Sequence, residues 1–261
     1  MKGRVLAVAG SDSGGGAGIE ADIKTATALG AYAATAITAL TVQNTLGIER
    51  QMAVPADFVA QAMAAVLRDI GADAVKTGML ATAATVAAVA ATIDACAPGV
   101  PLVVDPVMVS SSGTRLLSED AVGVLKRRLI PRAAVITPNI AEAGILAGQR
   151  IADRDAMIAA AAALLETGPR AVVITGGHLP GPTVRDVICD ADGVAVLEAP
   201  RLAGRSFHGT GCTFASAIAT SLAQGMALRG AVERAQRFVR DAIAAAPGLG
   251  SGNGPLNHRP L

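Results

Sequence analysis

Two glycine-rich segments have the composition of turns that bind anions. Residues 10–18 read Gly-Ser-Asp-Ser-Gly-Gly-Gly-Ala-Gly, and residues 208–213 read His-Gly-Thr-Gly-Cys-Thr. Glycine lets the backbone approach a ligand closely, and a helix that begins after such a turn offers free N–H groups and the positive end of its dipole. We therefore expect donors at Gly209, Thr210 and Gly211 to suit phosphate oxygens, and the same dipole to favour the thiolate of Cys212. A turn that only caps a helix is the alternative at both segments.

Neither segment carries a standard nucleotide-binding fingerprint. Residues 16–21 formally fit the dinucleotide motif, but Val-Gln-Asn at 42–44 ends the second predicted strand, where an NAD-binding protein has an acidic residue for the ribose. Residues 71–77 end in Lys-Thr but lack the glycine that precedes the lysine of a Walker A loop. The sequence therefore disfavours both an NAD site and a P-loop.

Oxygen ligands follow two of the predicted strands. Asp105 comes directly after a Val-Val pair, and Asn139 and Glu142 come after another strand. Residues just past the carboxyl ends of parallel strands line the ligand crevice of an open sheet. Asn139 and Glu142 share one face of a predicted helix start, and Mg²⁺ accepts such oxygens directly or through water. A helix cap with a glutamate in the first turn would use the same two residues.

Short β-branched runs alternate with longer alanine-rich segments of helical period, which is typical of strand-helix-strand units around a parallel sheet. Strands are predicted at residues 5–9, 34–41, 74–76, 102–104, 135–137 and 171–175. Helices are predicted at residues 18–29, 56–68, 82–96, 118–128, 153–167, 211–224 and 229–246, with a Gly/Pro/Asn-rich tail after the last. Alternating runs at 184–188 and 194–198 flank Ala-Asp-Gly, which predicts a hairpin and an antiparallel edge.

Composition narrows the class of protein. The 261 residues include 22 Lys and Arg against 21 Asp and Glu, and 52% are apolar, which excludes a disordered chain and a polybasic nucleic-acid binder. No apolar run approaches the roughly 20 residues that cross a bilayer, and the start lacks a secretory signal, so we expect a cytoplasmic protein without membrane partners. The 3 cysteines lack metal-binding spacing and are expected to be free thiols. One domain over residues 1–261 is expected, with a core plus a small lid as the alternative.

Several motifs occur jointly in the order and spacing of one family. They are Ala-Gly-Ser-Asp at 9–12, Gly-Ile-Glu-Ala-Asp at 18–22, Val-Gln-Asn-Thr at 42–45, Lys-Thr-Gly-Met-Leu at 76–80, Asp-Pro-Val at 105–107, Thr-Pro-Asn at 137–139 with Glu142, Gly-Gly-His at 176–178 and His-Gly-Thr-Gly-Cys-Thr at 208–213. From about residue 4 to residue 245 the chain resembles the hydroxymethylpyrimidine/phosphomethylpyrimidine kinases of thiamine biosynthesis, in the ribokinase-like superfamily.

The resemblance implies a fold and an activity. The fold is a three-layer α/β/α arrangement around a mainly parallel sheet, in a homodimer. The activity is phosphorylation of 4-amino-5-hydroxymethyl-2-methylpyrimidine, and then of its monophosphate, by ATP with Mg²⁺. The resemblance also assigns site residues. The anion hole is Gly209, Thr210 and Gly211, and Cys212 stands where many relatives carry an aspartate base. Asp105 and Glu142 belong to the Mg²⁺ site, and the nucleotide site comprises Asn139, Glu142, Thr175 and Gly177.

The family places the pyrimidine at Gly10, Asp22, Gln43, Met79 and Val107. The amide of Gln43 carries a donor beside an acceptor, which complements the ring nitrogen and amine of an aminopyrimidine. Alternatives are a backbone-capping amide for Gln43, core filling for Met79 and a surface position for Asp22. Thr175 departs from the family, which usually has a lysine there, and a phosphate-facing cation is therefore absent at that position.

Two other functions stay open. A pyridoxal or pyridoxine kinase of the same superfamily would also phosphorylate a hydroxymethyl group on a flat heteroaromatic ring. A non-catalytic pyrimidine-sensing domain is suggested only by Thr175. The three histidines are assigned no function: His178 and His208 are expected to make local hydrogen bonds, and His258 to lie in the tail.

Overall fold

The structure is a computed structural model that describes residues 1–110, 113–202 and 207–259. Its strands are β1 (Arg4–Asp12), β2 (Tyr32–Asn44), β3 (Gly47–Ala53), β4 (Ala74–Thr77), β5 (Leu102–Val104), β6 (Val135–Ile136), β7 (Ala171–Ile174), β8 (Thr183–Asp190), β9 (Gly193–Pro200), β10 (Phe207–His208) and β11 (Gly254–Pro255). Its α-helices are α1 (Gly18–Ala28), α2 (Ala56–Asp69), α3 (Ala83–Cys96), α4 (Glu119–Arg128), α5 (Ile140–Ala147), α6 (Arg154–Leu165), α7 (Thr210–Ala223) and α8 (Leu228–Ala244).

Strands β1 to β9 form one sheet in the order β3-β2-β1-β4-β5-β6-β7-β8-β9. The central strands β2, β1, β4, β5, β6 and β7 run parallel, while β3, β8 and β9 are antiparallel to their neighbours. Strands β8 and β9 are the predicted hairpin, so the expected antiparallel edge is confirmed. The parallel strands all end at the same edge of the sheet, where loops can gather side chains from distant parts of the chain.

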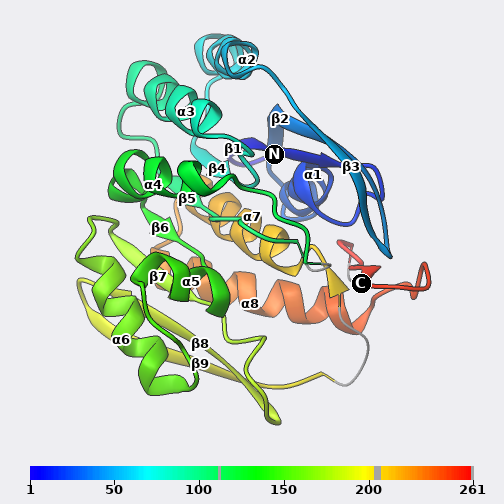
Figure 1. Cartoon of the computed structure of the whole chain (residues 1–261), viewed down its shortest axis with the longest axis vertical. Coiled ribbons are helices and arrows are strands. Elements are labelled where there is room, and N and C mark those ends of the chain that lie inside the picture. Colours follow the sequence, from blue (N-terminus) through cyan, green and yellow to red (C-terminus); the bar gives the residue numbers. More distant parts are fainter. Residues whose placement is uncertain (111–112, 203–206, 260–261) are drawn as a thin grey trace.

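Helices cover both faces of the sheet (Figure 1). Because alternate residues of a strand face opposite sides, Val104 and Ile136 pack among helices α2 to α6, whereas Val103 and Val135 pack under α7 and α8. Helix α1 lies on the α7 side. The expected three-layer arrangement is therefore confirmed, and its core is two apolar layers made mainly of alanine and branched side chains.

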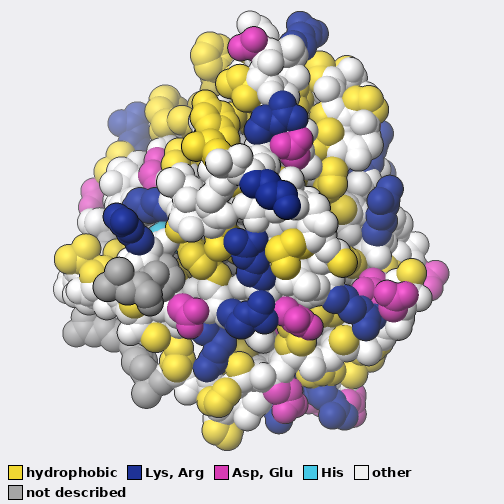
Figure 2. Space-filling view, turned by 180° about the vertical axis from the view of Figure 1, so that it is seen from behind, with side chains coloured by type: hydrophobic (Ala, Val, Ile, Leu, Met, Phe, Trp, Pro, Cys, Tyr) yellow, Lys and Arg dark blue, Asp and Glu magenta, His cyan; other side chains and the backbone are white. Residues whose placement is uncertain are grey.

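Local signals in the sequence set several helix ends. Thr82 begins α3 by accepting a hydrogen bond from the N–H of Thr85 at 3.2 Å, and Asp153 begins α6 through the N–H of Ala156 at 2.9 Å. Gly148 ends α5 in the left-handed conformation, with φ +68°. No helix in the described ranges is long and apolar enough to cross a membrane. On the face that Figure 2 shows, basic and acidic side chains are interspersed.

The first edge of the sheet differs from expectation. Strand β3 makes a second antiparallel edge that the sequence does not predict, because Glu49, Arg50 and Gln51 are exposed and the strand lacks an apolar alternation. Strand β1 also runs on to Asp12, so the first glycine-rich segment begins as a strand and turns only afterwards. The chain past β6 forms the complete helix α5, of which only the start was expected.

The C-terminal segment is not the free tail that the composition suggests. The N–H of Asn253 donates to the carbonyl of Thr45 at 2.8 Å, and β11 pairs with β10. His258 is buried, with Nε2 2.9 Å from Oγ1 of Thr213. The expectation for His258 is therefore wrong, because a Gly/Pro/Asn-rich segment can be ordered by contacts that are distant in sequence.

Candidate active site

Residues from several of the predicted motifs lie at the carboxyl ends of the parallel strands. Asp12 ends β1, Gln43 lies near the end of β2, Met79 follows β4, Asp105 follows β5, Asn139 follows β6 and Thr175 follows β7. Helix α7 begins against the same edge, and it contacts β1, β4 and β5. The structure thus brings together residues that the sequence separates by more than half of the chain length.

The two glycine-rich segments meet each other. Gly209 precedes α7 in the left-handed conformation, with φ +82°, and a Cβ added there would lie 1.9 Å from the carbonyl oxygen of Gly16. Only glycine permits this approach. The first turn of α7, which begins at Thr210, therefore starts directly beside the loop that precedes α1. This arrangement is suited to the predicted anion hole, because the free N–H groups of α7 point toward its start.

A buried ion pair lies beneath this loop. Lys76 is fully buried, and its Nζ lies 2.8 and 3.0 Å from the two carboxylate oxygens of Asp22. Ser216, in α7, donates to the same carboxylate at 2.6 Å. Burial opposes the charge of Lys76, but the carboxylates of Asp22 and Asp105 raise its pKa above the ordinary value. Asp22 is buried rather than exposed on a helix surface, and its predicted contact with the pyrimidine stays a prediction.

Asp105 and Cys212 complete this charged cluster. Oδ2 of Asp105 lies 4.0 Å from Nζ of Lys76, and the charge of Asp105 is close enough to Cys212 to raise the pKa of its thiol. Burial raises the pKa of Cys212 to about 12, against the pull of Lys76 and with support from the Asp105 and Asp22 charges. The raised pKa opposes the expected thiolate at the start of α7, because desolvation disfavours the charged form of the thiol.

Asn139 and Glu142 form a reciprocal helix cap. Oδ1 of Asn139 accepts from the N–H of Glu142 at 3.0 Å, and Oε2 of Glu142 accepts from the N–H of Asn139 at 3.0 Å. Oε1 of Glu142 accepts from the N–H of Met108 at 3.3 Å. Burial, together with the nearby charge of Asp105, raises the pKa of Glu142 to about 8. The capping alternative is thus confirmed, and a role toward Mg²⁺ or phosphate would be an additional one.

The carboxylates of Asp105 and Glu142 fit a magnesium ion. Oδ2 of Asp105 is a buried oxygen without a hydrogen-bond partner, and burial raises the pKa of Asp105 to about 6 even though Lys76 opposes the rise. A cation between two buried carboxylates would relieve their repulsion. The described residues contain no group of three or more His, Cys, Asp or Glu that could hold a metal. Mg²⁺ in kinases usually takes one or two carboxylates, with water and phosphate as further ligands, so this donor set is sufficient.

The predicted nucleotide residues lie on neighbouring strand ends. Thr175 bridges to Asn139, and its N–H donates to the carbonyl of Pro138 at 3.1 Å. Gly177 is exposed, and its carbonyl accepts from Nη1 of Arg201 at 2.8 Å. Arg201 also donates to the carbonyls of Leu179 and Gly181. This region therefore offers mainly backbone groups, held in place by an arginine that the sequence analysis does not single out.

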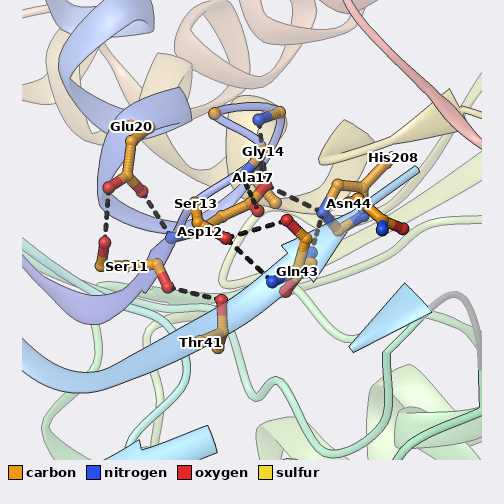
Figure 3. A network of polar contacts seen from close by, with 12 residues as sticks. Ser11, Asp12, Ser13, Gly14, Ala17, Glu20, Thr41, Gln43, Asn44 and His208 are labelled. Atoms are coloured by element: carbon orange, nitrogen blue, oxygen red, sulfur yellow. Dashed lines mark hydrogen bonds and ion pairs between the residues drawn. The ribbon is translucent and has the colours of Figure 1, made fainter. Parts of the chain in front are cut away.

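Gln43 belongs to a side-chain network at the ends of β1 and β2 (Figure 3). Its Nε2 lies 2.5 Å from Nε2 of His208, and the same ring nitrogen lies 3.1 Å from Oδ2 of Asp12. Asp12 accepts from the N–H groups of Gly14, Gly16 and Ala17 at 2.8, 2.9 and 2.9 Å. Despite burial, the hydrogen bonds from His208 and from these backbone amides hold the pKa of Asp12 below its usual range.

The apolar part of the predicted pyrimidine site is compact. A Cβ added to Gly10 would lie 2.9 Å from Sδ of Met79, so the thioether rests against the glycine. Met79 packs with Ala39 and Leu116 in a small apolar cluster that Val107 borders. Met79 is therefore a buried packing residue, as the core-filling alternative states, and it also borders the predicted pyrimidine site at the strand ends.

Sequence reasoning missed four residues of this region. Lys76 and Asp12 lie in quoted motifs but received no role, His208 was expected to make only local hydrogen bonds, and Ser216 was not considered. A lysine inside the otherwise apolar run Ala-Val-Lys-Thr is the one signal that was available, because a buried lysine requires a partner.

Comparisons with known proteins agree with this geometry. The family model described as phosphomethylpyrimidine kinase matches residues 12–257. The chain is 50% identical over 257 residues to the thiamine biosynthesis bifunctional protein of Geobacter sulfurreducens. The matched region covers 98% of this chain and 52% of that protein. It is 47% identical over 256 residues to the hydroxymethylpyrimidine/phosphomethylpyrimidine kinase of Rhizobium meliloti, and here the matched region covers 97% of this chain and 96% of that protein.

A solved structure is similar over the whole chain. The ADP complex of Bacillus subtilis pyridoxal kinase superposes with a TM-score of 0.91 at 35% identity, covering 100% of this chain and 99% of that one. The chain therefore spans about half of the Geobacter protein and nearly all of the Rhizobium protein, and its fold is that of a nucleotide-binding kinase.

Proposed function

We propose that the chain, which belongs to the phosphomethylpyrimidine kinase family, phosphorylates a pyrimidine in two steps. It first transfers the terminal phosphoryl group of ATP to the hydroxymethyl group of 4-amino-5-hydroxymethyl-2-methylpyrimidine. It then phosphorylates the monophosphate. One observation carries this proposal. Gln43, the start of α7 at Thr210 and the carboxylate pair of Asp105 and Glu142 all belong to the same edge of the sheet. An aromatic acceptor, a phosphate and a cation can therefore meet there.

Each group has a distinct task in the reaction. The backbone N–H groups at Gly209, Thr210 and Gly211 stabilise the charge that spreads over the transferred phosphoryl oxygens. Cys212 lies at the same helix start and interacts electrostatically with Asp105, so this pair can position the acceptor hydroxyl and receive its proton. Lys76 holds the carboxylates of Asp22 and Asp105 at fixed positions below the reacting atoms.

Mg²⁺ is proposed at Asp105 and Glu142, where it would neutralise charge on the ATP phosphates. Asn139 supports this position because its capping contact fixes the first turn that carries Glu142. Thr175 and Gly177 are proposed to border the nucleotide through their backbone. A cytoplasmic location is proposed as well, since the reaction consumes ATP.

A homodimer is proposed from the exposed apolar side chains of the β2 and β3 ribbon. Leu40, Val42 and Met52 are 42, 52 and 56% exposed, which is unusual for neighbouring apolar residues of a sheet. Light scattering of the purified protein tests this proposal, and a monomer over the working concentration range would contradict it.

The reaction is tested by incubating the purified protein with Mg-ATP and each acceptor and identifying the products by mass. We expect a monophosphate and then a diphosphate of the hydroxymethylpyrimidine. A protein that is folded by circular dichroism and consumes neither pyrimidine acceptor would overturn the proposal.

A pyridoxal kinase is the second candidate, because the similar solved structure is one. The amide of Gln43 favours the pyrimidine, since pyridoxal offers a phenolic oxygen and an aldehyde in place of the amine and ring nitrogen. We expect kcat/KM for the pyrimidine to be at least about 10²-fold higher than for pyridoxal. Gln43→Leu is expected to remove most of this preference by penalising the pyrimidine, whereas Gln51→Leu, on the exposed β3, serves as the matched control. Equal values in the unmodified protein would favour the pyridoxal kinase.

A further inference from the structure

The C-terminal segment is fixed against several parts of the candidate site. The N–H of Asn253 donates to the carbonyl of Thr45 at 2.8 Å, in the turn between β2 and β3. Strand β11 then pairs with β10, and a Cβ added to Gly16 would lie 3.2 Å from Cβ of Pro255, so the segment rests against the loop before α1. The turn after β2, the loop before α1 and β10 therefore hold residues 253–255 in place.

His258 ends this segment with a hydrogen bond to α7. Its Nε2 lies 2.9 Å from Oγ1 of Thr213, and both side chains are buried. A hydroxyl can donate or accept, so the contact suits either tautomer of the neutral ring. Thr213 directly follows Cys212, and its N–H donates to the carbonyl of Gly209 at 2.9 Å, which closes the first turn of the helix. The hydrogen bond of His258 therefore acts on the turn that carries the donors of the predicted anion hole.

The Thr213 hydroxyl has a different partner from two later hydroxyls of the same helix. Thr220 and Ser221 each donate their hydroxyl to the carbonyl four residues earlier, at 2.7 and 2.8 Å. A contact of this kind slightly destabilises a helix and often bends it. For Thr213 the carbonyl four residues earlier belongs to Gly209, but its hydroxyl is bonded to His258 instead. The ring therefore occupies a hydroxyl that could otherwise bend the first turn of α7.

We propose that His258 is a positioning residue for phosphoryl transfer, which holds the Thr213 hydroxyl away from the carbonyl of Gly209 and so keeps the first turn of α7 regular. The inference rests on the proposed function, in which the N–H groups of that turn stabilise the transferred phosphoryl group. Such donors must point to the place where charge develops in the transition state. A small tilt of the turn therefore lowers kcat more than it weakens the binding of either substrate.

Loss of the ring should be repaired by loss of the hydroxyl. In His258→Leu, the Thr213 hydroxyl loses its partner and can turn to the carbonyl of Gly209. When Thr213→Val is added, no hydroxyl remains to make that contact, and valine has nearly the same shape as threonine. His258→Gln keeps a side-chain amide that can still pair with the hydroxyl. These variants therefore separate the role of the hydroxyl from the space that the ring fills.

The test measures kcat, and KM for ATP and for the hydroxymethylpyrimidine, in variants that are folded by circular dichroism. We expect His258→Leu to lower kcat about tenfold, with both KM values within about twofold of the unmodified protein. His258→Gln and the double variant His258→Leu/Thr213→Val should have kcat within about threefold of the unmodified protein. Should His258→Leu not fold, His258→Phe gives the same comparison, because its ring also lacks a hydrogen-bonding atom.

Thr220→Val supplies the matched control, because it removes a buried hydroxyl of the same helix that does not contact His258. Added to His258→Leu, it should leave kcat low. Recovery of kcat by Thr220→Val as well would show a general effect of the valine and overturn the proposal. A double variant with Thr213→Val that is as slow as His258→Leu would overturn it too, and so would an unchanged kcat in His258→Leu.

The failure of this inference differs from the failure of the proposed function. If the unmodified protein phosphorylates neither pyrimidine acceptor, the proposed function fails and the inference fails with it. If the unmodified protein is active and Thr213→Val does not restore His258→Leu, only the role of His258 fails.

Discussion

The acceptor end of the candidate site, around Gln43, is formed by side chains, whereas the nucleotide end, around Thr175, is formed mainly by backbone groups. At the acceptor end, Asp12, Gln43 and His208 are side chains that contact one another across β1, β2 and β10 (Figure 3). At the nucleotide end, Thr175 and Gly177 contribute backbone contacts, and Asn139 caps a helix. A small aromatic substrate is recognised by the positions of a few donors and acceptors, whereas phosphates can be held by backbone N–H groups that many sequences supply.

The charged cluster of Lys76, Asp22, Asp105 and Cys212 lies between these ends. Lys76, Asp22 and Asp105 are buried, and removing one partner of a buried ion pair leaves an uncompensated charge in the protein interior. This cluster should therefore respond to substitution through both folding and catalysis. The nucleotide end should respond through ATP binding alone.

Lys76→Met should have the largest effect. It leaves the Asp22 and Asp105 carboxylates buried without their cation, so we expect the free energy of unfolding to fall by about 3–5 kcal/mol. We also expect kcat to fall at least about 10²-fold, because the positive charge beside Cys212 is lost. Urea titration and steady-state kinetics measure both quantities, with Lys126→Met as the control, since Lys126 is an exposed lysine of α4 that donates to the carbonyl of Leu146.

The double variant Lys76→Met/Asp22→Asn distinguishes the two effects. The neutral amide can still accept from Ser216, so part of the lost stability should return while kcat stays low. Recovery of kcat together with stability would show that Lys76 acts only as a structural partner of Asp22.

His258→Gln should change the pH dependence of stability. Burial lowers the pKa of His258 to about 4, whereas an unfolded histidine titrates near 6.5. Between these values the unfolded chain binds the proton more readily, so stability falls as the pH drops from about 6.5 toward 4. The loss amounts to about 3 kcal/mol at most, and the glutamine variant should lack it. Urea unfolding of both proteins at pH 7 and at the low end of this window measures the difference, and parallel curves would contradict the assignment.

Cys212→Ala should lower kcat by roughly 10²-fold if the thiol positions or deprotonates the acceptor hydroxyl, because that is a typical contribution of a general base. A loose transition state needs less help from a base, so the decrease in kcat could be smaller than about 10²-fold. KM for ATP should change little. Cys212→Ser keeps a group that can hydrogen-bond Asp105 and should retain more activity than alanine. An unchanged kcat in Cys212→Ala would reassign the residue to capping of α7.

The parallel core was predictable from the sequence because its strands and helices carry the strongest periodic signals. Residues 102–104 and 171–175 were expected as strands, and the structure has β5 and β7 there. Strand β3 was not predictable, since its exposed polar residues are ordered by pairing with β2 and not by burial. The buried position of His258 depends on a contact with Thr213, which no local pattern encodes.

The candidate site shows the same division. The glycine-rich loops and Gln43 could be found because their residue types suit particular chemistry in short motifs. The contact between His208 and Asp12 joins β10 to β1, and each residue looks like an ordinary local hydrogen-bonding group in sequence. The high pKa of Cys212 was also missed, because desolvation depends on burial by several elements and not on the adjacent helix alone.

Thr175→Lys should have the smallest effect, and this effect should be confined to KM for ATP. The lysine that the family usually carries would bring a cation to the nucleotide end, and we expect a gain of about 1 kcal/mol at most, because ordering a flexible side chain opposes the attraction. KM for ATP should therefore fall by no more than about fivefold, while KM for the pyrimidine stays unchanged. Thr167→Lys, which precedes β7 at the opposite edge of the sheet, controls for added charge. Arg201 already donates to the carbonyl of Gly177, so it is the group that could compete with the new lysine. If Thr175→Lys raises KM for ATP and the added substitution Arg201→Gln brings KM back to the original value, the arginine serves this end of the site. The nucleotide end would then also use a side chain, and its contrast with the side-chain network around Gln43 would be smaller than the backbone contacts alone indicate.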